Sequence, residues 1–250
     1  MQSAPMYLAL SPHCSLRLLE KPCVYDRAHD ELYELDKEAG NFVRTLPVPI
    51  NGREVEHADP EFLRYCLEEG IFSRVSERLP RKRVIQGPIP SLRYLLLHIT
   101  TRCNLKCTHC FLGDVEPLDL PLEQVAYVMK EFDELQGLRL LVSGGEPFLH
   151  PQFWEINELF ERFSFRTVIL SNGTSLANPG FVERLRAQEV QVSLDGVGPS
   201  HEALRGAGAF SKTLRGLENL AESDIDVSVA TMVHAGNVGD FDELESIVRN

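Results

Sequence analysis

The sequence has no apolar run long enough to cross a bilayer, and its first ten residues lack the basic region and long apolar core of a signal peptide. Basic residues are also few, because 25 Lys and Arg stand against 37 Asp and Glu and leave a formal charge of −12. That balance repels phosphate backbones and disfavours nucleic acid as the main partner. We therefore expect a cytoplasmic protein of 250 residues, without a membrane or nucleic-acid partner and with room for two modest domains.

Six cysteines are present, and they divide into two kinds. Because the chain shows no export signal, disulfides are not expected, and the isolated thiols of Cys14, Cys23 and Cys66 are predicted to be plain buried or half-buried thiols. The other three lie within eight residues, in the stretch Cys103-Asn-Leu-Lys-Cys107-Thr-His-Cys110. Three thiols this close together indicate a metal site.

The number of thiols in this stretch points to chemistry more than to structure. An iron–sulfur cubane takes one thiolate per iron, so three ligands leave one iron open to another molecule. An open metal position is typical of a reactive site. The alternative is a zinc knuckle with His109 as the fourth ligand, but that leaves the later Gly144-Gly-Glu-Pro147 group unexplained.

Residues 1–80 predict a small α+β domain. Short alternating runs, beginning with Tyr7-Leu-Ala-Leu and separated by turn residues, predict a small antiparallel sheet. Asp36 is suited to cap one helix, and Asp59 with Pro60 to start another that Gly70 ends. This order of elements is typical of a winged-helix-like module. The stretch from Pro80 to Pro90 contains three prolines and a basic triplet. This composition predicts a linker at residues 81–91.

Residues 92–250 alternate apolar strand-like runs with amphipathic helical patterns, which predicts a parallel sheet with helical crossovers. Polar or glycine-rich groups follow each of five predicted strands: Thr100 to Cys110, Ser143 to Pro147, Ser171 to Thr174, Ser193 to Gly196, and Thr231. Because the carboxyl ends of parallel strands meet at one edge, these groups converge there as in α/β barrels. We therefore predict an α/β fold with a partial, TIM-like (β/α) barrel.

The four motifs Cys103-x-x-x-Cys107-x-x-Cys110, Gly144-Gly-Glu-Pro147, Ser171-Asn-Gly173 and Ser193-Leu-Asp-Gly196 occur in that order at successive strand ends. In this respect residues 92–250 resemble the radical S-adenosylmethionine (radical SAM) superfamily. The stretch His201 to Phe210 further resembles the subgroup that matures peptides, which often carries a C-terminal domain with extra clusters.

The resemblance implies two cofactors and one reaction. Cys103, Cys107 and Cys110 would hold a [4Fe–4S] cluster whose fourth iron chelates S-adenosylmethionine. Reductive cleavage of S-adenosylmethionine would then give a 5′-deoxyadenosyl radical that removes a hydrogen atom from the substrate. A low-potential electron donor such as a ferredoxin or flavodoxin is implied as a partner.

The resemblance also assigns roles in binding S-adenosylmethionine. Gly144 and Gly145 would let the backbone approach the methionine part, Glu146 would accept from its ammonium group, and Pro147 would rigidify the turn. Four residues at two further strand ends would reach the carboxylate or the ribose: Ser171, Asn172, Ser193 and Asp195.

Two more residues are assigned to the same ligand. Arg205 would pair with its carboxylate, and His109 takes the position that the family usually gives to an aromatic residue near the adenine.

The N-terminal module resembles the precursor-peptide recognition elements of peptide maturases. These elements are similar to winged helices but bind a leader peptide as an added strand along a sheet edge. The implied partner is the leader region of a ribosomally made peptide, and the implied reaction is a crosslink in that peptide. The alternative for this module is a plain structural cap; DNA binding is disfavoured because its helices carry Asp and Glu.

The family barrel typically has six strands, whereas the pattern here provides five before Asn250. We therefore expect a fragment of a longer enzyme that lacks the last strand and any auxiliary-cluster domain. Two alternative functions stay open. One is a radical SAM maturase of a protein residue or a cofactor precursor, and the other is a non-catalytic iron–sulfur protein.

Overall fold

The computed structural model describes residues 6–80 and 84–249. Contacts between Cα atoms divide the chain into two compact units. The first comprises Met1–Arg93 with Phe132–Leu138, and the second comprises Tyr94–Glu131 with Arg139–Asn250. Each unit is described by itself below.

The first unit contains two three-stranded antiparallel sheets. One has the order β5-β1-β6 and the other the order β2-β3-β4. The strands are β1 (Tyr7–Leu10), β2 (Cys14–Leu18), β3 (Pro22–Asp26), β4 (Glu31–Glu34), β5 (Val48–Pro49) and β6 (Phe72–Val75). The predicted strands are thus confirmed, but they form two sheets instead of one, and the two-residue β5 was not predicted.

Three helices complete the first unit: α1 (Lys37–Thr45), α2 (Arg53–Glu56) and α3 (Pro60–Glu68). The predicted caps are confirmed, because Asp36 accepts from the backbone N–H of Ala39 at 2.8 Å and Asp59 caps the start of α3. Gly70 follows α3 at a φ of 71°, a conformation that favours glycine. The single turn α2 carries no periodic apolar pattern, so the sequence did not predict it.

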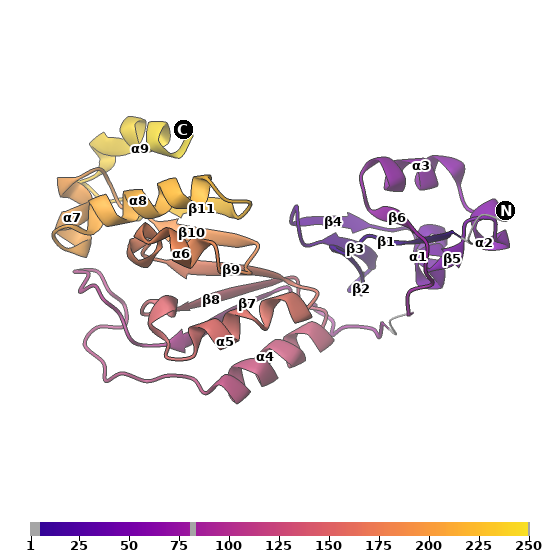
Figure 1. The fold of residues 1–250 in the computed structure, drawn as a ribbon, viewed down its shortest axis with the longest axis horizontal. Coiled ribbons are helices and arrows are strands. Elements are labelled where there is room, and N and C mark those ends of the chain that lie inside the picture. Colours follow the sequence, from indigo (N-terminus) through magenta and orange to yellow (C-terminus); the bar gives the residue numbers. More distant parts are fainter. Residues whose placement is uncertain (1–5, 81–83, 250) are drawn as a thin grey trace. The chain divides into compact units, whose positions relative to one another are not determined.

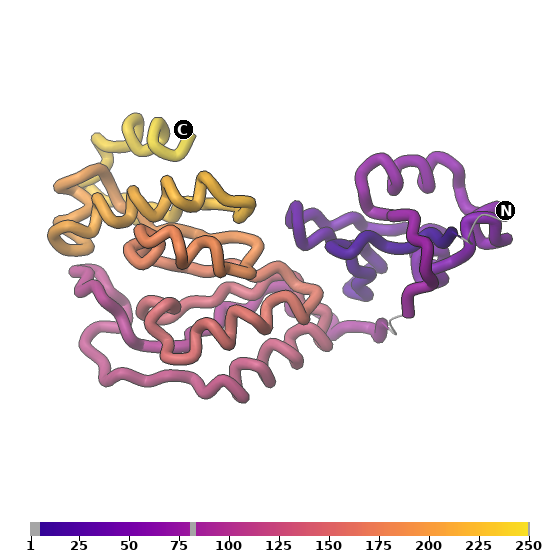
Figure 2. Tube along the Cα trace, viewed as in Figure 1, coloured from indigo at the N-terminus to yellow at the C-terminus, as the bar shows by residue number. Residues whose placement is uncertain are grey.

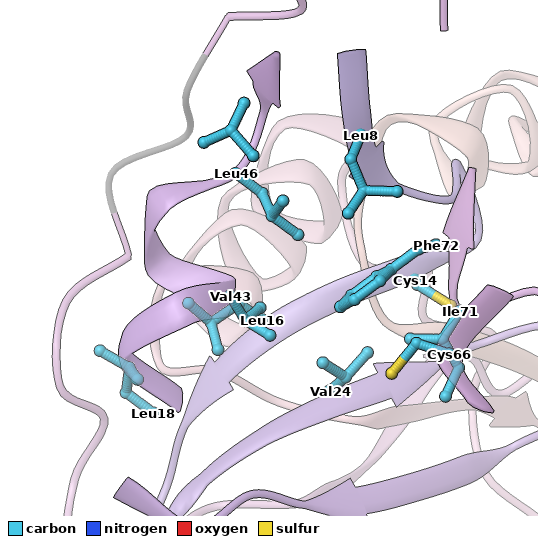
Figure 3. Packing of buried hydrophobic residues seen from close by; sticks show 11 residues of the cluster. Leu8, Cys14, Leu16, Leu18, Val24, Val43, Leu46, Cys66, Ile71 and Phe72 are labelled. Carbon is cyan, nitrogen blue, oxygen red and sulfur yellow. The ribbon is translucent and has the colours of Figure 1, made fainter. Parts of the chain in front are cut away.

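Apolar side chains from both sheets and from α1 and α3 form the core of the first unit (Figure 3). The sulfur atoms of Cys14 and Cys66 lie among these side chains, and Cys23 is also buried. The prediction that the isolated cysteines are buried free thiols is therefore confirmed. Burial raises the pKa of the Cys14 and Cys66 thiols to about 12, because a thiolate would lose its hydration there.

The described part of the predicted linker, residues 84–91, has no helix or strand but is held to residues 18–20 by hydrogen bonds. The N–H of Gly87 donates to the carbonyl of Leu18 at 2.8 Å, and the N–H of Ser91 donates to Glu20 at 2.7 Å. This segment is therefore anchored. The basic triplet Arg81 to Arg83 lies outside the described residues.

The second unit is built on a five-stranded sheet with the order β11-β10-β9-β8-β7, in which all neighbours are parallel. Its strands are β7 (Tyr94–Thr100), β8 (Arg139–Gly144), β9 (Arg166–Ser171), β10 (Glu189–Ser193) and β11 (Asp226–Ala230). Each strand pairs with the next one in the sequence, which is the order of a barrel. The predicted partial (β/α) barrel is confirmed.

Six helices belong to these crossovers and the segment after β11: α4 (Leu122–Glu134), α5 (Phe153–Asn157), α6 (Pro179–Val182), α7 (Pro199–Arg205), α8 (Ala209–Ala221) and α9 (Phe241–Arg249). Figure 1 shows α4, α5 and α8 running along the outside of the sheet. Asn178 caps α6, which has only four residues, by accepting from the N–H of Gly180. No helix within the described part of the chain is long and apolar enough to cross a membrane.

Short 3-10 turns stand at Pro147–Leu149, Phe160–Arg162, Thr174–Ala177 and Val238–Asp240. The first and third follow the carboxyl ends of β8 and β9 directly. The chain therefore turns sharply where these strands end, and the polar groups there stay at the edge of the sheet.

Candidate functional site

The three clustered cysteines lie on a long loop between β7 and α4, which Figure 2 shows as an extended excursion of the chain. Cys103 and Cys110 are exposed, Cys107 is half-buried, and all three are free thiols. The N–H of Cys110 donates to the carbonyl of Cys107 at 3.1 Å, so these two residues share a tight turn. A loop without regular structure needs outside contacts to hold its thiols in place.

The first contact is with the end of β8. The N–H of Gly145 donates to the carbonyl of Thr100 at 2.8 Å, and the N–H of Glu146 donates to the carbonyl of Arg102 at 2.7 Å. A Cβ on Gly144 would lie 2.2 Å from the Thr100 oxygen, and one on Gly145 would lie 2.4 Å from the Arg102 oxygen. Both glycines are therefore needed for the cysteine loop to approach β8; their contact with the methionine part of a cofactor stays a prediction.

The second contact is with the end of β9, through three polar side chains. Asn172 Nδ2 donates to Asn104 Oδ1 at 2.9 Å, and Asn104 Nδ2 donates to Thr174 Oγ1 at 2.7 Å. Thr174 Oγ1 in turn donates to Asn172 Oδ1 at 2.6 Å. This closed ring fixes the residue next to Cys103. The sequence singles out Asn172 for a ligand and places Thr174 in the polar group after this strand, but it gives no role to Thr174 or Asn104.

The third contact is with α7, at the other end of the cysteine stretch. The N–H of Thr108 donates to the carbonyl of Leu204 at 2.8 Å. The cysteine loop is thus attached to the chain that follows β8, β9 and β10. The thiols consequently lie at the edge where the carboxyl ends of the strands meet.

Glu146 is completely buried at this edge. Its carboxylate accepts from Ser171 Oγ at 2.9 Å and from the N–H of Asn172 at 2.8 Å. Burial raises the pKa of Glu146 to about 7, although these two hydrogen bonds favour the charged form and oppose the rise. Pro147, also buried, begins the turn after it. The role of Glu146 as acceptor for a ligand ammonium group stays a prediction.

Arg205, which is half-buried, forms an ion pair with the buried Asp195, and Arg205 Nε donates to Asp195 Oδ2 at 2.5 Å. Asp195 Oδ1 also accepts from the N–H of Met232 at 2.8 Å, so it links the ends of β10 and β11. The resemblance implies that both side chains reach S-adenosylmethionine. The structure shows that each has the other as a partner, and any contact with a ligand stays a prediction.

Two histidines flank this ion pair. His109 Nε2 lies 3.7 Å from Asp195 Oδ2, and the N–H of Asp195 donates to His201 Nδ1 at 3.1 Å. His109 Nδ1 is buried without a hydrogen-bond partner among the described residues. A buried nitrogen without a partner can form a hydrogen bond with a ligand.

The remaining residues at the edge are Ser193 and Asn237. Ser193 is half-buried at the last position of β10. Asn237 is fully buried, and its Nδ2 donates to the carbonyls of Asp195 and Met232 at 2.8 Å each. Asn237 was not predicted from the sequence; its place six residues after Thr231, the polar residue that follows β11, was the available signal.

The donor set fits an iron–sulfur cluster better than a single metal ion. A tetrahedral zinc site, with Zn–S bonds of about 2.3 Å, would bring its sulfur atoms within about 4 Å of one another. Across residues 6–80 and 84–249, the cysteine sulfurs of this loop do not form a group of three ligand atoms within 4.8 Å of each other. Thiolates spread over a loop are what a multi-iron cluster requires.

Fold and site together define a class of protein. It has a parallel (β/α) sheet and a three-cysteine loop anchored at the edge where the carboxyl ends of the strands meet. Residues 97–249 match the family model of the Radical SAM superfamily, and the chain belongs to that superfamily. The cofactors of the family are a [4Fe–4S] cluster and S-adenosylmethionine, and Cys103, Cys107 and Cys110 are the residues here that would hold the cluster.

The chain is similar to two kinds of curated protein. It is 33% identical over 160 residues to the mycofactocin maturase MftC of Mycobacterium ulcerans, which covers 61% of this chain and 43% of MftC. It is 34% identical over 154 residues to an AdoMet-dependent heme synthase of Methanosarcina barkeri, which covers 58% of this chain and 44% of that protein. The chain thus spans less than half the length of these relatives.

Among solved structures, the chain is similar to SuiB of Streptococcus suis bound to S-adenosylmethionine. The TM-score is 0.67 at 15% identity, and the match covers 96% of this chain and 60% of SuiB. At this identity the likeness concerns the fold. It includes most of the first unit as well as the sheet of the second.

Proposed function

We propose that this chain carries the catalytic core of a radical SAM enzyme that modifies a ribosomally made peptide. When bound, the cluster and S-adenosylmethionine supply a 5′-deoxyadenosyl radical that removes a hydrogen atom from the substrate. The observation that carries the proposal is the anchoring of the cysteine loop to the ends of β8 and β9 and to α7, beside the buried Glu146.

In this proposal the chain's own residues bind and orient the cofactors. Cys103, Cys107 and Cys110 hold the cluster, and the loop contacts keep their spacing. Glu146 offers a buried carboxylate to the ammonium group of S-adenosylmethionine, where burial strengthens a charge-assisted hydrogen bond. The unpartnered His109 Nδ1 offers a polar contact to the nucleoside part.

Two similarities support a peptide substrate. MftC is named a maturase, and one SuiB structure contains the precursor peptide SuiA. In the first unit, β4 is hydrogen-bonded to β3 on one side only within the described sheet, so its other side offers backbone groups to an added strand. Glu31 and Glu34 are exposed on this strand and favour a leader segment with basic residues.

A cofactor precursor is the second candidate substrate, and the similarity to the heme synthase favours it. In that case the first unit would serve as a structural cap. In either case reduction of the cluster needs a low-potential electron donor, for which we propose a ferredoxin or flavodoxin.

The proposed activity is tested by reconstituting the cluster anaerobically, reducing it with dithionite and measuring 5′-deoxyadenosine. We expect this product from the wild-type protein and none from Cys107→Ala. No product from a fully cluster-loaded wild-type sample would refute the proposal. Cys66→Ala is the matched control, because Cys66 is buried in the first unit and should not affect the reaction.

The substrate is tested by peptide binding. We expect a short peptide encoded beside the gene to bind the protein, and substitution of a β4 residue by proline, such as Glu34→Pro, to weaken binding at least tenfold. A proline would bend the strand and disturb the edge on which the peptide pairs. Equal binding by Glu34→Pro, or turnover of a porphyrin precursor alone, would favour the second candidate.

A further inference from the structure

Two histidines and an aspartate of the first unit come together at one end of the β2-β3-β4 sheet. His13 directly precedes β2, Asp26 is the last residue of β3, and His29 lies in the turn that leads to β4. The strand register pairs Cys14 with Asp26, so His13 and His29 are brought to the same end of the hairpin. None of the three takes part in the proposed radical chemistry.

Their ligand atoms are close enough for one metal ion. One nitrogen of each imidazole and one oxygen of Asp26 all lie within 4.8 Å of one another. His29 Nδ1 is 2.8 Å and His13 Nε2 is 3.6 Å from Asp26 Oδ2. A tetrahedral zinc ion with bonds of about 2.0–2.2 Å places its ligand atoms about 3.4 Å apart. The two distances to Asp26 Oδ2 lie within about 0.6 Å of this value, and no two ligand atoms of the group are more than 4.8 Å apart.

Asp26 is held in the orientation that such a site needs. Its side chain is 1% exposed, and its Oδ1 accepts from the N–H groups of Ala28 at 2.8 Å and His29 at 3.2 Å. These bonds use one oxygen and direct the other, Oδ2, at the imidazoles. Backbone donors that orient a carboxylate in this way are typical of the groups behind metal ligands.

Charge and access agree with this arrangement. Burial alone would raise the pKa of Asp26, but hydrogen bonds from the His29 side chain and from backbone N–H groups, with His13 nearby, hold that pKa below its ordinary value. The carboxylate is therefore anionic at neutral pH. The side chains of His13 and His29 are 35% and 67% exposed, so an ion can enter from solvent.

We propose that His13, Asp26 and His29 bind one divalent transition-metal ion of the zinc class, with water in the remaining position. Two imidazole nitrogens and one carboxylate suit zinc, whereas calcium and magnesium prefer oxygen ligands alone. The ion would join the segment before β2 to the turn between β3 and β4. It would thereby stabilise the first unit, independently of the cluster in the second.

The test is zinc binding to the full, cluster-loaded chain after chelator treatment, by equilibrium dialysis and metal analysis with iron measured in the same samples. We expect one zinc per chain in the wild type, at least tenfold weaker binding in His29→Gln, and loss of binding in the double variant His13→Gln/His29→Gln. His57→Gln is the matched control, because His57 is an exposed histidine of the same unit outside the group, and it should bind as the wild type does.

A second measurement guards against misfolding of the double variant. Zinc should raise the thermal unfolding midpoint of the wild type and of His57→Gln by more than that of His29→Gln, whose exposed side chain can be replaced without loss of the fold. Equal zinc content in the wild type and His29→Gln, or no zinc in the wild type, would overturn the proposal. Unchanged iron content in all variants separates this outcome from any failure of the proposed radical chemistry.

Discussion

Asn172 at the end of β9 donates a 2.9 Å hydrogen bond from Nδ2 to Oδ1 of Asn104, which adjoins the first cysteine of the loop. The bond joins residues 68 positions apart in the sequence. Together with Thr174 it forms a closed ring, so the cysteine loop is fastened by three side chains that are not ligands of the proposed cluster.

This ring predicts that Asn104→Ala weakens the cluster without removing a ligand. The substitution leaves polar groups of Asn172 and the buried Thr174 without their partner, which costs about 1–3 kcal/mol and loosens the loop. We expect the reconstituted cluster to lose iron to a chelator several times faster than in the wild type.

Asn178→Ala is the matched control for that experiment. Asn178 caps α6 by accepting from the N–H of Gly180 at 3.1 Å and belongs to the same unit, but it takes no part in the ring. Its loss should lower stability by about 1 kcal/mol and leave iron release unchanged. Equal release rates in Asn104→Ala and the wild type would show that the ring does not hold the cluster.

The close approach between β8 and the cysteine loop predicts that Gly145→Ala is harmful. A Cβ there would lie 2.4 Å from the carbonyl oxygen of Arg102, so the backbone of one segment must move. Overpacking of this kind costs about 1–3 kcal/mol, measured as a lower midpoint in chemical unfolding. Gly239→Ala is the control, because a Cβ at that position has no neighbour within 4 Å. Equal midpoints of chemical unfolding for both variants would show that the approach between β8 and the cysteine loop is not sterically constrained.

The buried carboxylate of Glu146 predicts a separation between cluster assembly and ligand binding. In Glu146→Gln the amide can still pair with Ser171 and with the N–H of Asn172, but the negative charge is gone. We expect normal iron content and about tenfold or more weaker binding of S-adenosylmethionine, since hydrogen bonds between charged groups contribute about 1.5–3 kcal/mol. Isothermal titration of the cluster-loaded protein measures this. Unchanged affinity would leave Glu146 a purely structural role.

The pKa values of Cys14 and Cys66 are both raised to about 12. They predict that the two thiols resist alkylation and that the first unit loses stability at high pH. A thiol whose pKa is higher in the folded than in the unfolded chain stabilises the fold at any pH below its pKa in the unfolded chain. That stabilisation is lost as the pH rises from about 9 towards 12. We expect the first unit to lose stability above pH 9, and Cys66→Ala to reduce this loss.

Alkylation followed by peptide mass spectrometry checks the same point without unfolding. In the cluster-free native chain at pH 8, iodoacetamide should label the exposed Cys110 and leave Cys14 and Cys66 unlabelled. Labelling of Cys66 at the rate of Cys110 would contradict the burial described above.

Local patterns in the sequence were sufficient for most elements of the fold. The Asp36 and Asp59 caps and the five apolar runs of the parallel sheet each depend on neighbours within a few residues. The parallel order then brought Cys107 and Glu146 to one edge, because successive strands end on the same side. The single-turn α2 and the two-residue β5 have too few residues for a periodic pattern.

The pairing of side chains within the site was not accessible in the same way. Asn104 was an ordinary loop residue in the sequence, and its partners lie about 70 positions away. Asp195 and Arg205 were assigned to a ligand from their positions alone, and the ion pair between them was not predicted. A motif shows that a residue type is needed at a strand end. It does not distinguish a residue that contacts a ligand from one that supports its neighbours.

The central claim is that the anchored cysteine loop presents a [4Fe–4S] cluster whose open iron binds S-adenosylmethionine. The most direct measurement is the electron paramagnetic resonance spectrum of the reduced, reconstituted protein with and without S-adenosylmethionine. We predict a spectrum of a reduced cubane that changes when S-adenosylmethionine is added, and no such spectrum from Cys107→Ala. A cluster signal that S-adenosylmethionine leaves unchanged would contradict the claim and indicate a non-catalytic iron–sulfur protein.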